Sequence, residues 1–449
     1  MVSRVGTRLR SHVKRWTQAR SQSKERWHAG QGEKAKSGSS IFSALGPGVI
    51  TGAADDDPSG IATYSIAGAQ HGLALLWTAL ITWPLMAFVQ MMCARIGMVS
   101  GRGLAGAMHH KYPRPLILVA AVALFAANSI NVGADLSGMS DAAEMLTRVN
   151  SHVFVIVFGV GISVATIFFR YHQIATILKW LALVLFAYVI TGFIVHPDWR
   201  MVAHAAFIPT WPKSHDQWGM LVAILGTTIS PYLFFWQASQ EVEEDKAKGR
   251  RMLYRRFGAT PVEIITRKID VDVGTFFSNL VMFFIILTTA LTLHQHGITH
   301  IETSKDAAQA LSPLAGKFAG TLFTLGIVGV GLLAIPTLTG SAAYALAETF
   351  AWREGLDQRF RGARPFYLVI IVSTLIGIAM DFLHVNPVRA LYWTAVINGL
   401  LAPFLLLGII FVALDRKLMK QQPSSIPSVI VVSVATLFMF GAAIGMFIF

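Results

Sequence analysis

Three adjacent aspartates at positions 55–57 interrupt an otherwise apolar stretch, and Pro58 and Gly60 follow them at once. Proline removes a backbone donor and glycine adds backbone freedom, so a helix through this stretch is expected to break at the carboxylates. At membrane depth, charges and unpaired backbone groups are tolerated only against protein or a water-filled cavity. Transporters build cation sites where two half-helices meet at such a break. The spacing therefore predicts a cation site at these residues.

A short loop between two separate helices is the alternative interpretation of this stretch. It is disfavoured because the flanking residues 41–54 and 61–70 are each shorter than the roughly 20 apolar residues of a membrane span. Asp57 is predicted to be the principal metal ligand. Asp56 is either a second ligand or the cap of a half-helix, where the helix dipole favours an anion, and Asp55 is expected to line a vestibule or form a cap.

The composition is that of a polytopic, all-α membrane protein. Of the 449 residues, 54% are hydrophobic and only 14% are charged. The single cysteine, Cys93, lies in an apolar run, which excludes a disulfide framework and a cysteine-based metal site. The net charge of +13 does not indicate nucleic-acid binding, because the basic residues cluster in the gaps between apolar runs. The expected partner is the lipid bilayer.

Eleven membrane spans are expected, and the basic residues predict their orientation. The spans cover about residues 41–71 (broken), 73–98, 115–147, 152–169, 174–196, 217–243, 271–293, 314–349, 367–385, 388–414 and 428–449. With the amino terminus inside, 29 of the 37 Lys and Arg residues lie in the inner segments 1–40, 99–114, 170–173, 245–270, 350–366 and 415–427. We therefore expect a multi-pass protein of the cell (inner) membrane with a cytoplasmic amino terminus and an extracytoplasmic carboxyl terminus. Residues 1–40 form a basic tail that is expected to be disordered or to lie on the anionic inner leaflet.

A second break is predicted in span six. Pro231 lies in the middle of this span, behind Gly226 and the hydroxyl residues Thr227, Thr228 and Ser230. Interruptions in spans one and six occupy corresponding positions in two five-helix halves, which is typical of an inverted-repeat transporter of the LeuT type. The predicted transporter core covers residues 41–414, with repeats at about 41–196 and 217–414 and an additional eleventh helix at 428–449.

Several short motifs in the expected spans form a pattern known from one family. Gly46-Pro47-Gly48, Asp57-Pro58 and Ala67-Gly68-Ala69-Gln70 are similar to the first-helix pattern G-P-G, D-P-G-N and A-G-A-Q of that family. Ala134-Asp135-Leu136, Thr337-Leu338-Thr339-Gly340 and Ala402-Pro403-Phe404 continue the similarity, which covers about residues 44–412. In these motifs the chain resembles the natural resistance-associated macrophage protein (NRAMP) family. The resemblance implies a LeuT-like fold that moves divalent transition-metal ions by alternating access, usually with protons.

The chain departs from the family pattern where the resemblance implies metal binding and proton movement. Asp57 matches the metal-binding aspartate, while Gly60 stands in place of an asparagine and Ser230 in place of the metal-binding methionine. Thr227 falls on an alanine that provides a backbone-carbonyl ligand. The other replacements are Tyr232 for histidine, Gly138 for glutamate, Ala334 for glutamine and Leu401 for glutamine, with Asn398 one turn before Leu401. These departures resemble the divergent, NRAMP-related magnesium-transporter branch.

Ligand chemistry favours the same interpretation. A thioether is a soft ligand that suits transition metals and offers little to Mg²⁺. Hydroxyl groups at Thr227, Thr228 and Ser230 harden the site, and Gly60 widens it for an ion that keeps several of its waters. The open alternative is that Thr227 and Ser230 only satisfy carbonyl groups freed around Pro231.

Other polar residues in the spans are candidates for the cavity or for a proton route. Asp135, with Asn131 one turn before it, is expected to line the cavity or to form a helix–helix hydrogen bond. Asn398 is a candidate ligand or an interhelical contact. Tyr232 replaces a proton-route histidine, and an unperturbed phenol titrates near pH 10, so proton transfer through it is expected to be impaired. The acidic residues 241–245 are expected to pair with the following basic loop rather than to form a cation vestibule.

The leading prediction is a secondary transporter or facilitator of divalent cations, chiefly Mg²⁺ and also Mn²⁺. It would be driven mainly by the membrane potential, with weak or no proton coupling. The alternatives are a proton-coupled Mn²⁺ or Fe²⁺ transporter and an amino-acid permease on the same fold, which Asp57 disfavours because it would repel a substrate carboxylate. No nucleophile–base pair or cofactor motif suggests an enzyme. The transported ion is the only expected metal, and the chain is expected to act as a monomer.

Overall fold

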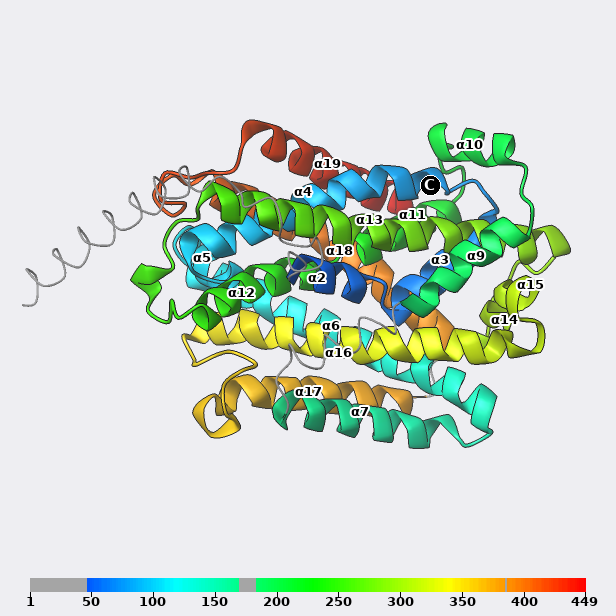
Figure 1. Ribbon diagram of the computed structural model, residues 1–449, viewed down its shortest axis with the longest axis horizontal. Coiled ribbons are helices and arrows are strands. Elements are labelled where there is room, and N and C mark those ends of the chain that lie inside the picture. Colours follow the sequence, from blue (N-terminus) through cyan, green and yellow to red (C-terminus); the bar gives the residue numbers. More distant parts are fainter. Residues whose placement is uncertain (1–46, 169–182, 384–385) are drawn as a thin grey trace, which may run out of the picture.

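The computed structural model describes residues 47–168, 183–383 and 386–449, which form helices joined by turns and loops (Figure 1). Nine helical segments of this described part are long and apolar enough to cross a membrane. Among them, His215–Ala247 and Ser304–Phe350 contain short interruptions of the α-helix and are each counted once. The helices are α2 Pro47–Asp55, α3 Pro58–His71, α4 Trp77–Ser100, α5 Leu104–Met108, α6 Arg114–Thr147, α7 Ser151–Phe168, α9 Phe186–Ile194, α10 Trp199–Phe207, α11 His215–Thr228, α12 Pro231–Ala247, α13 Pro261–Thr292, α14 Ser304–Ala308, α15 Ser312–Ala315, α16 Ala319–Phe350, α17 Arg364–Asp381, α18 Pro387–Leu414 and α19 Ile426–Ile448.

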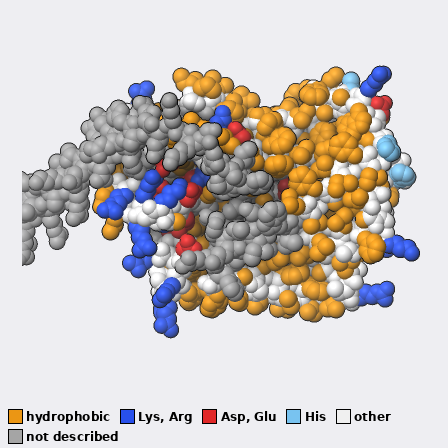
Figure 2. Space-filling view, in the orientation of Figure 1, with side chains coloured by type: hydrophobic (Ala, Val, Ile, Leu, Met, Phe, Trp, Pro, Cys, Tyr) orange, Lys and Arg blue, Asp and Glu red, His pale blue; other side chains and the backbone are white. Residues whose placement is uncertain are grey.

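The outer surface of the helix bundle is apolar along its length. Helix α7, for example, exposes Val153, Val157, Val160 and Val164, which are each 45–56% accessible. On the face shown in Figure 2, hydrophobic side chains cover the part between the two ends, and Lys and Arg side chains lie at the ends. This distribution is that of a multi-pass membrane protein, because the lipid core accepts apolar side chains and excludes charges.

Three of the segments that are predicted to be cytoplasmic, 99–114, 245–270 and 415–427, lie together at one end of the molecule. The amide of Gly258 donates to the carbonyl of Val99 (2.9 Å), and the amide of Ala259 donates to the Gln422 side chain (3.1 Å). Three loops far apart in sequence therefore meet near α5, at the left in Figure 1. The side of the membrane that this end faces stays a prediction.

Two helices begin away from the expected boundaries of their membrane spans. Helix α13 begins at Pro261 instead of 271, because a capping box formed by Thr260 and Glu263 starts it in the polar loop. Helix α16 begins at Ala319 instead of 314, after Gly316 adopts a positive φ of 51°. The expected tail 1–40 and the first part of span five, 174–182, lie outside the described residues. The short helix α10 was not expected.

The predicted break in the first span is confirmed. Helix α2 ends at Asp55 and α3 begins at Pro58, so only two residues separate them. Asp57 caps α3 by accepting a hydrogen bond from the amide of Gly60, and proline at the first helical position needs no donor there. The acids and the proline thus define the break together.

The predicted break in the sixth span is also confirmed. Helix α11 ends at Thr228 and α12 begins at Pro231, with Ser230 in an extended conformation between them (φ −77°, ψ 131°). The Ser230 hydroxyl lies within hydrogen-bond distance of the Gly226 carbonyl (2.9 Å) and the Thr227 carbonyl (2.6 Å). It thereby satisfies backbone groups that the break frees.

The two broken helices lie in the interior of the bundle. In the most apolar 18-residue stretch of α11 and α12 together, 94% of the residues are buried. The corresponding share for α7, at the periphery, is 22%. Close packing requires glycine at the crossing of α11 with α18, because a Cβ atom on Gly226 would lie 2.1 Å from the Ala395 carbonyl oxygen. The second broken helix is therefore packed closely against α18, and in the first broken helix residues 58–69 of α3 are buried as well.

Candidate functional site

Asp57 is the centre of the polar groups at the first break. One carboxylate oxygen accepts hydrogen bonds from the Ser59 hydroxyl (2.6 Å) and the Gly60 amide (2.8 Å), and the other accepts from the Asn131 side-chain amide (3.2 Å). Asp57 is only 2% exposed. Since a carboxylate offers about four acceptor positions, these three bonds orient the group and leave it able to bind a cation.

Helix α6 adds a second carboxylate on the side of Asn131. Asp135 lies one turn further along this helix, is fully buried, and forms no hydrogen bond to another side chain of the described residues. The carbonyl oxygen of the Asn131 side chain is likewise unpartnered in that part of the chain. The expectation that both residues line one cavity agrees with the Asn131–Asp57 contact.

Thr227 and Gly60 bring the two breaks together. A Cβ atom built on Gly60 would lie 3.2 Å from the Thr227 hydroxyl oxygen, so the two residues are direct neighbours. The Thr227 oxygen is buried and makes no hydrogen bond to another described residue. The Thr227 hydroxyl oxygen, near the end of α11, is therefore directed at the first break and is available as a ligand.

Ser230 and Thr228 are oriented differently from Thr227. The Ser230 hydroxyl points to carbonyl groups of α11, which is the alternative that the sequence left open. The Thr228 hydroxyl donates to the Ile224 carbonyl (2.7 Å) and lies 3.1 Å from the Tyr64 hydroxyl. Their role as metal ligands stays a prediction, and Thr227 has the better geometry of the three.

Asp55 and Asp56 point to a different helix from Asp57. The Ser278 hydroxyl of α13 lies 2.7 Å from a carboxylate oxygen of Asp55 and 3.1 Å from one of Asp56. The second Asp55 oxygen is buried and unpartnered among the described residues. Sequence reasoning missed Ser278, although its place among other polar residues of an apolar span, Thr275 and Asn279, was a usable signal.

A thioether also lies near the second break, which the sequence did not indicate. The sulfur of Met282, on α13, is 3.8 Å from the Thr228 hydroxyl and 3.9 Å from the Thr82 hydroxyl. Met282 comes from a distant segment, so its proximity could not be read from the motif around Pro231. The polar groups at the breaks are therefore not exclusively hard oxygen donors.

Tyr232 and Asn398 take structural positions beside the breaks. The Tyr232 hydroxyl donates to the Ala54 carbonyl (2.8 Å), at the last turn of α2. Asn398 is buried on α18 next to Gly399, where α18 crosses α11. Its carbonyl oxygen has no partner among the described residues. Tyr232 thus connects the two broken helices, and Asn398 stays a candidate.

We define the break cluster as Asp55, Asp56, Asp57 and Asp135. Each of these carboxylates is at most 5% exposed, and none forms an ion pair with a Lys, Arg or His of the described residues. No three His, Cys, Asp or Glu side chains of that part of the chain already stand in a metal-binding arrangement. A bound cation would therefore need hydroxyl, amide, backbone or water oxygens as well.

Three of the four acidic residues at the end of α12 pair with the following basic residues, as expected, whereas Glu241 pairs with Arg267 of α13. Glu243 lies 2.6 Å from Lys246, Glu244 lies 2.7 Å from Lys248, and Asp245 lies 2.7 Å from Arg250. Burial alone would lower the pKa of the Arg250 guanidinium, but the carboxylates of Asp245 and Glu263 raise it. These charges therefore stabilise one another at the end of the helix.

The fold and the paired breaks define a polytopic membrane protein of the LeuT-like class. It is similar to the solved manganese transporter of Eremococcus coleocola (TM-score 0.69, 17% identity, 91% of this chain and 88% of that chain). It is also similar to Mhp1, a nucleobase-cation-symport-1 family transporter (TM-score 0.53, 14% identity, 90% and 92%). At these identities the likeness concerns the fold alone.

Residues 48–449 match the family model described as natural resistance-associated macrophage protein-like, so the chain belongs to this family. Among its relatives is the divalent metal cation transporter MntH of Deinococcus radiodurans, with 25% identity over 84% of this chain and 83% of that protein. A second is the protein of the same name from Chromohalobacter salexigens, with 24% identity over 84% of each. The chain is a transporter-family protein and not an enzyme. The expected magnesium-transporter branch finds no support in these relatives.

Proposed function

We propose that this chain carries divalent metal cations across the membrane by alternating access, with Asp57 as the principal ligand. The break cluster carries this proposal. Four buried carboxylates without a basic partner cost several kcal/mol each unless a cation or a proton compensates them. Their place between two broken helices suits an ion that must be reached from either side in turn.

The proposed ligands extend from Asp57 to groups on both breaks. Thr227 offers a free hydroxyl oxygen beside Gly60, whose missing side chain leaves room for water. Asp56, Thr228, Ser230 and Asn398 are the further ligand candidates. Asp135, Asn131 and Tyr232 are the candidates for the cavity wall or a proton route.

Mn²⁺ is the cargo that we propose first. The relatives are called divalent metal cation transporters and the structural neighbour a manganese transporter, which favours the manganese alternative over Mg²⁺. The thioether of Met282 beside Thr228 supports this choice, because a soft donor suits a transition metal better than Mg²⁺. Mg²⁺ is the second candidate, since Asp57, Thr227 and Ser230 offer only oxygen.

We also propose the route and the orientation of the chain. A hollow of about 610 Å³ opens at the end of α3, lined among others by Ile66, His71, Asp216 and Met220. Ile66 follows Gly60 by six residues, about 9 Å along the helix axis. This hollow would be the outer entrance if the amino terminus is cytoplasmic. The two repeats at 41–196 and 217–414, and a monomeric state, belong to the same proposal.

Uptake into proteoliposomes tests the function. Mn²⁺ and Mg²⁺, with Ca²⁺ as a third ion, are compared in one preparation, beside the Asp57→Asn variant and empty liposomes. We expect uptake of Mn²⁺ above both controls. Transport of none of the three ions by folded wild-type protein would refute the proposal, and faster Mg²⁺ than Mn²⁺ uptake would replace Mn²⁺ by Mg²⁺ as the main cargo.

A further inference from the structure

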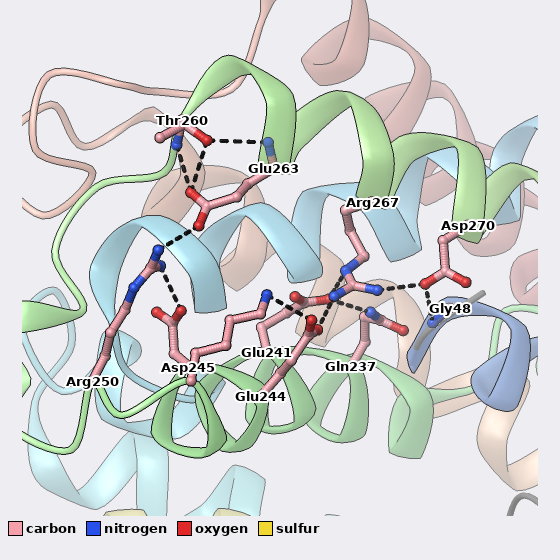
Figure 3. Close-up of polar contacts among 11 residues, drawn as sticks. Gly48, Gln237, Glu241, Glu244, Asp245, Arg250, Thr260, Glu263, Arg267 and Asp270 are labelled. Carbon is pink, nitrogen blue, oxygen red and sulfur yellow. Dashed lines mark hydrogen bonds and ion pairs between the residues drawn. The ribbon is translucent and has the colours of Figure 1, made fainter. Parts of the chain in front are cut away.

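The amino-terminal end of α2 is held by one side chain of another helix. The Asp270 carboxylate of α13 accepts hydrogen bonds from the amides of Gly48 (2.7 Å) and Val49 (3.2 Å), as Figure 3 shows for Gly48. First-turn amides have no partner within their own helix, and an anion at this end also matches the helix dipole. Asp270 therefore fixes where α2 begins relative to α13.

Arg267 connects this carboxylate to α12. Its guanidinium lies 2.5 Å from Asp270, 2.7 Å from Glu241 and in contact with Glu244 (Figure 3). Arg267 is 6% exposed and Glu241 is 3% exposed. This buried guanidinium pairs with three carboxylates. If it moves away from one of them, that carboxylate is left as a buried charge without a counter-ion.

Two further hydrogen bonds lead back to α2. The side-chain amide of Gln237 donates to the same Glu241 oxygen (2.7 Å). The Thr51 hydroxyl lies 2.7 Å from the side-chain oxygen of Gln237 and 2.7 Å from the Pro47 carbonyl oxygen, so it shares its proton between these two acceptors. Thr51, Gln237, Glu241, Arg267 and Asp270 thus form a closed circuit through α2, α12 and α13. We call these five residues the Arg267 ring.

Between the two ends of α2, small residues contact α13. A Cβ atom on Gly52 would lie 2.5 Å from the backbone of Gly274, and one on Gly274 would lie 2.4 Å from the Gly48 carbonyl oxygen. Glycines cannot interlock through side chains, so the polar contacts provide the specific attachment: the Arg267 ring at the amino-terminal end of α2, and the hydrogen bond from Ser278 to Asp55 at its other end. A hollow of about 230 Å³ lies beside the Arg267 ring, lined by Glu241, Glu244 and Arg267, and allows water to approach.

We propose that the Arg267 ring is the closure of the ion path at this end of the molecule, and that its opening releases α2 from α12 and α13. The inference rests on the proposed transport, because α2 ends at Asp55 beside Asp57, and its displacement exposes the break cluster to this side. Arg267 is a positioning residue in this account, since it acts on the ion only through α2.

Cysteine accessibility tests the proposal without any metal. Val271 is 1% exposed, and its backbone lies against Gly48, so Val271→Cys reports whether α2 covers α13. The protein with Cys93 alone, which is buried, gives the background. Labelling by a membrane-impermeant maleimide is measured in nanodiscs, well below the melting midpoint of each variant. We expect Arg267→Gln to raise the labelling rate at least tenfold, and Lys268→Gln, an exposed neighbour on the same helix, to change it less than twofold.

A second variant covers the case in which Arg267→Gln does not fold. Gly52→Ala keeps every charge of the Arg267 ring but forces α2 away from Gly274, so it should also raise the labelling rate. In uptake assays Arg267→Gln should lower the maximal rate while the metal concentration for half-maximal uptake stays within twofold. Unchanged labelling in both folded variants would overturn the closure even if Asp57→Asn confirms metal transport. Raised labelling without any metal uptake would leave the closure standing and refute the proposed cargo.

Discussion

The break cluster and the Arg267 ring are equally buried but balance their charges in different ways. Asp57 and Asp135 are 2% and 0% exposed, and Glu241 and Asp270 are 3% and 1% exposed. Arg267 lies between the second pair, whereas the first pair has no basic partner in the described chain. Since buried charges are stable only when compensated, the break cluster needs a mobile cation and the Arg267 ring already contains a fixed one.

The presence or absence of a fixed cation thus distinguishes the break cluster, a candidate binding site, from the Arg267 ring, a structural attachment. Acidic residues alone do not distinguish the two, because both groups contain at least two buried carboxylates. The distinguishing feature is the Arg267 guanidinium, which pairs with Glu241 of α12 and with Asp270 of its own helix α13. Substitutions at the break cluster should therefore abolish transport, whereas substitutions at the Arg267 ring should lower stability and only reduce the maximal rate of transport.

The largest expected effect is the loss of transport in Asp57→Asn. Asparagine keeps the size and can still accept the Gly60 amide, so the cap of α3 persists while the charge is lost. Uptake of Mn²⁺ should fall to the level of empty liposomes with little change in melting temperature. Uptake at wild-type level by a folded Asp57→Asn protein would place the ion elsewhere and remove the basis of the comparison.

Arg267→Met should have the largest effect on stability. It leaves Glu241 and Asp270 buried without their cation, and removing one partner of a buried ion pair costs about 3–5 kcal/mol. Urea or thermal unfolding in detergent measures the loss, with Lys268→Met as the exposed control. A loss below about 1 kcal/mol would mean that the Arg267 ring contributes little, and that its charges are compensated by water.

The sequence predicted the fold to the extent that local chemistry determines it. Both breaks could be located from proline and glycine next to acids or hydroxyl residues, because these residues remove backbone donors and free backbone groups within the same segment. Helix α13 begins ten residues before the expected span, since the capping box of Thr260 and Glu263 lies in a polar loop that hydropathy assigns to solvent. Hydropathy detects the lipid-facing part of a helix and not its full length.

The candidate site was predictable only where one segment carries it. Asp57 was identified from its own neighbours, and the contact of Asn131 with it agrees with the expected cavity. Ser278 and Met282 were not identified, because both come from α13 and their proximity to the breaks depends on packing. The same reason concealed the link from Asp270 to Gly48, which joins residues 222 positions apart.

Ser230→Met should change which ion is preferred. A thioether there adds a soft donor at the second break, so uptake of Mn²⁺ or Cd²⁺ should rise relative to Mg²⁺, by roughly tenfold if the sulfur reaches the ion. Competition between two ions in one uptake assay gives the ratio. Thr166→Met is the control away from the breaks, because Thr166 lies on α7 and its hydroxyl donates to the Ile162 carbonyl (2.8 Å). The same ratio in wild type and Ser230→Met would show that position 230 does not face the ion.

Tyr232→Phe should have a smaller effect, and on stability only. Its hydroxyl donates to the buried Ala54 carbonyl, and an unsatisfied carbonyl costs about 1–3 kcal/mol. Unfolding measurements should show a loss in this range, while Mn²⁺ uptake at a temperature where both proteins are folded stays within about threefold of wild type. An abolished uptake with unchanged stability would instead assign Tyr232 to the ion or proton path.

The smallest expected effect is that of a pH gradient on transport. Tyr232 occupies the position where the family resemblance implies a histidine, and its proton is held by the Ala54 carbonyl, so it is poorly placed to relay protons. Asp135 remains as a buried carboxylate on α6, but Gly138 stands where the family resemblance implies a second acid on this helix. A membrane potential alone provides about 4.6 kcal/mol per 100 mV for a divalent ion, twice the value for a single charge. Proteoliposomes with an internal pH-sensitive dye should therefore show Mn²⁺ entry with no acidification above that of empty liposomes. Acidification in step with Mn²⁺ entry, and its loss in Asp135→Asn, would show that the break cluster exchanges its charge with protons as well as with the metal.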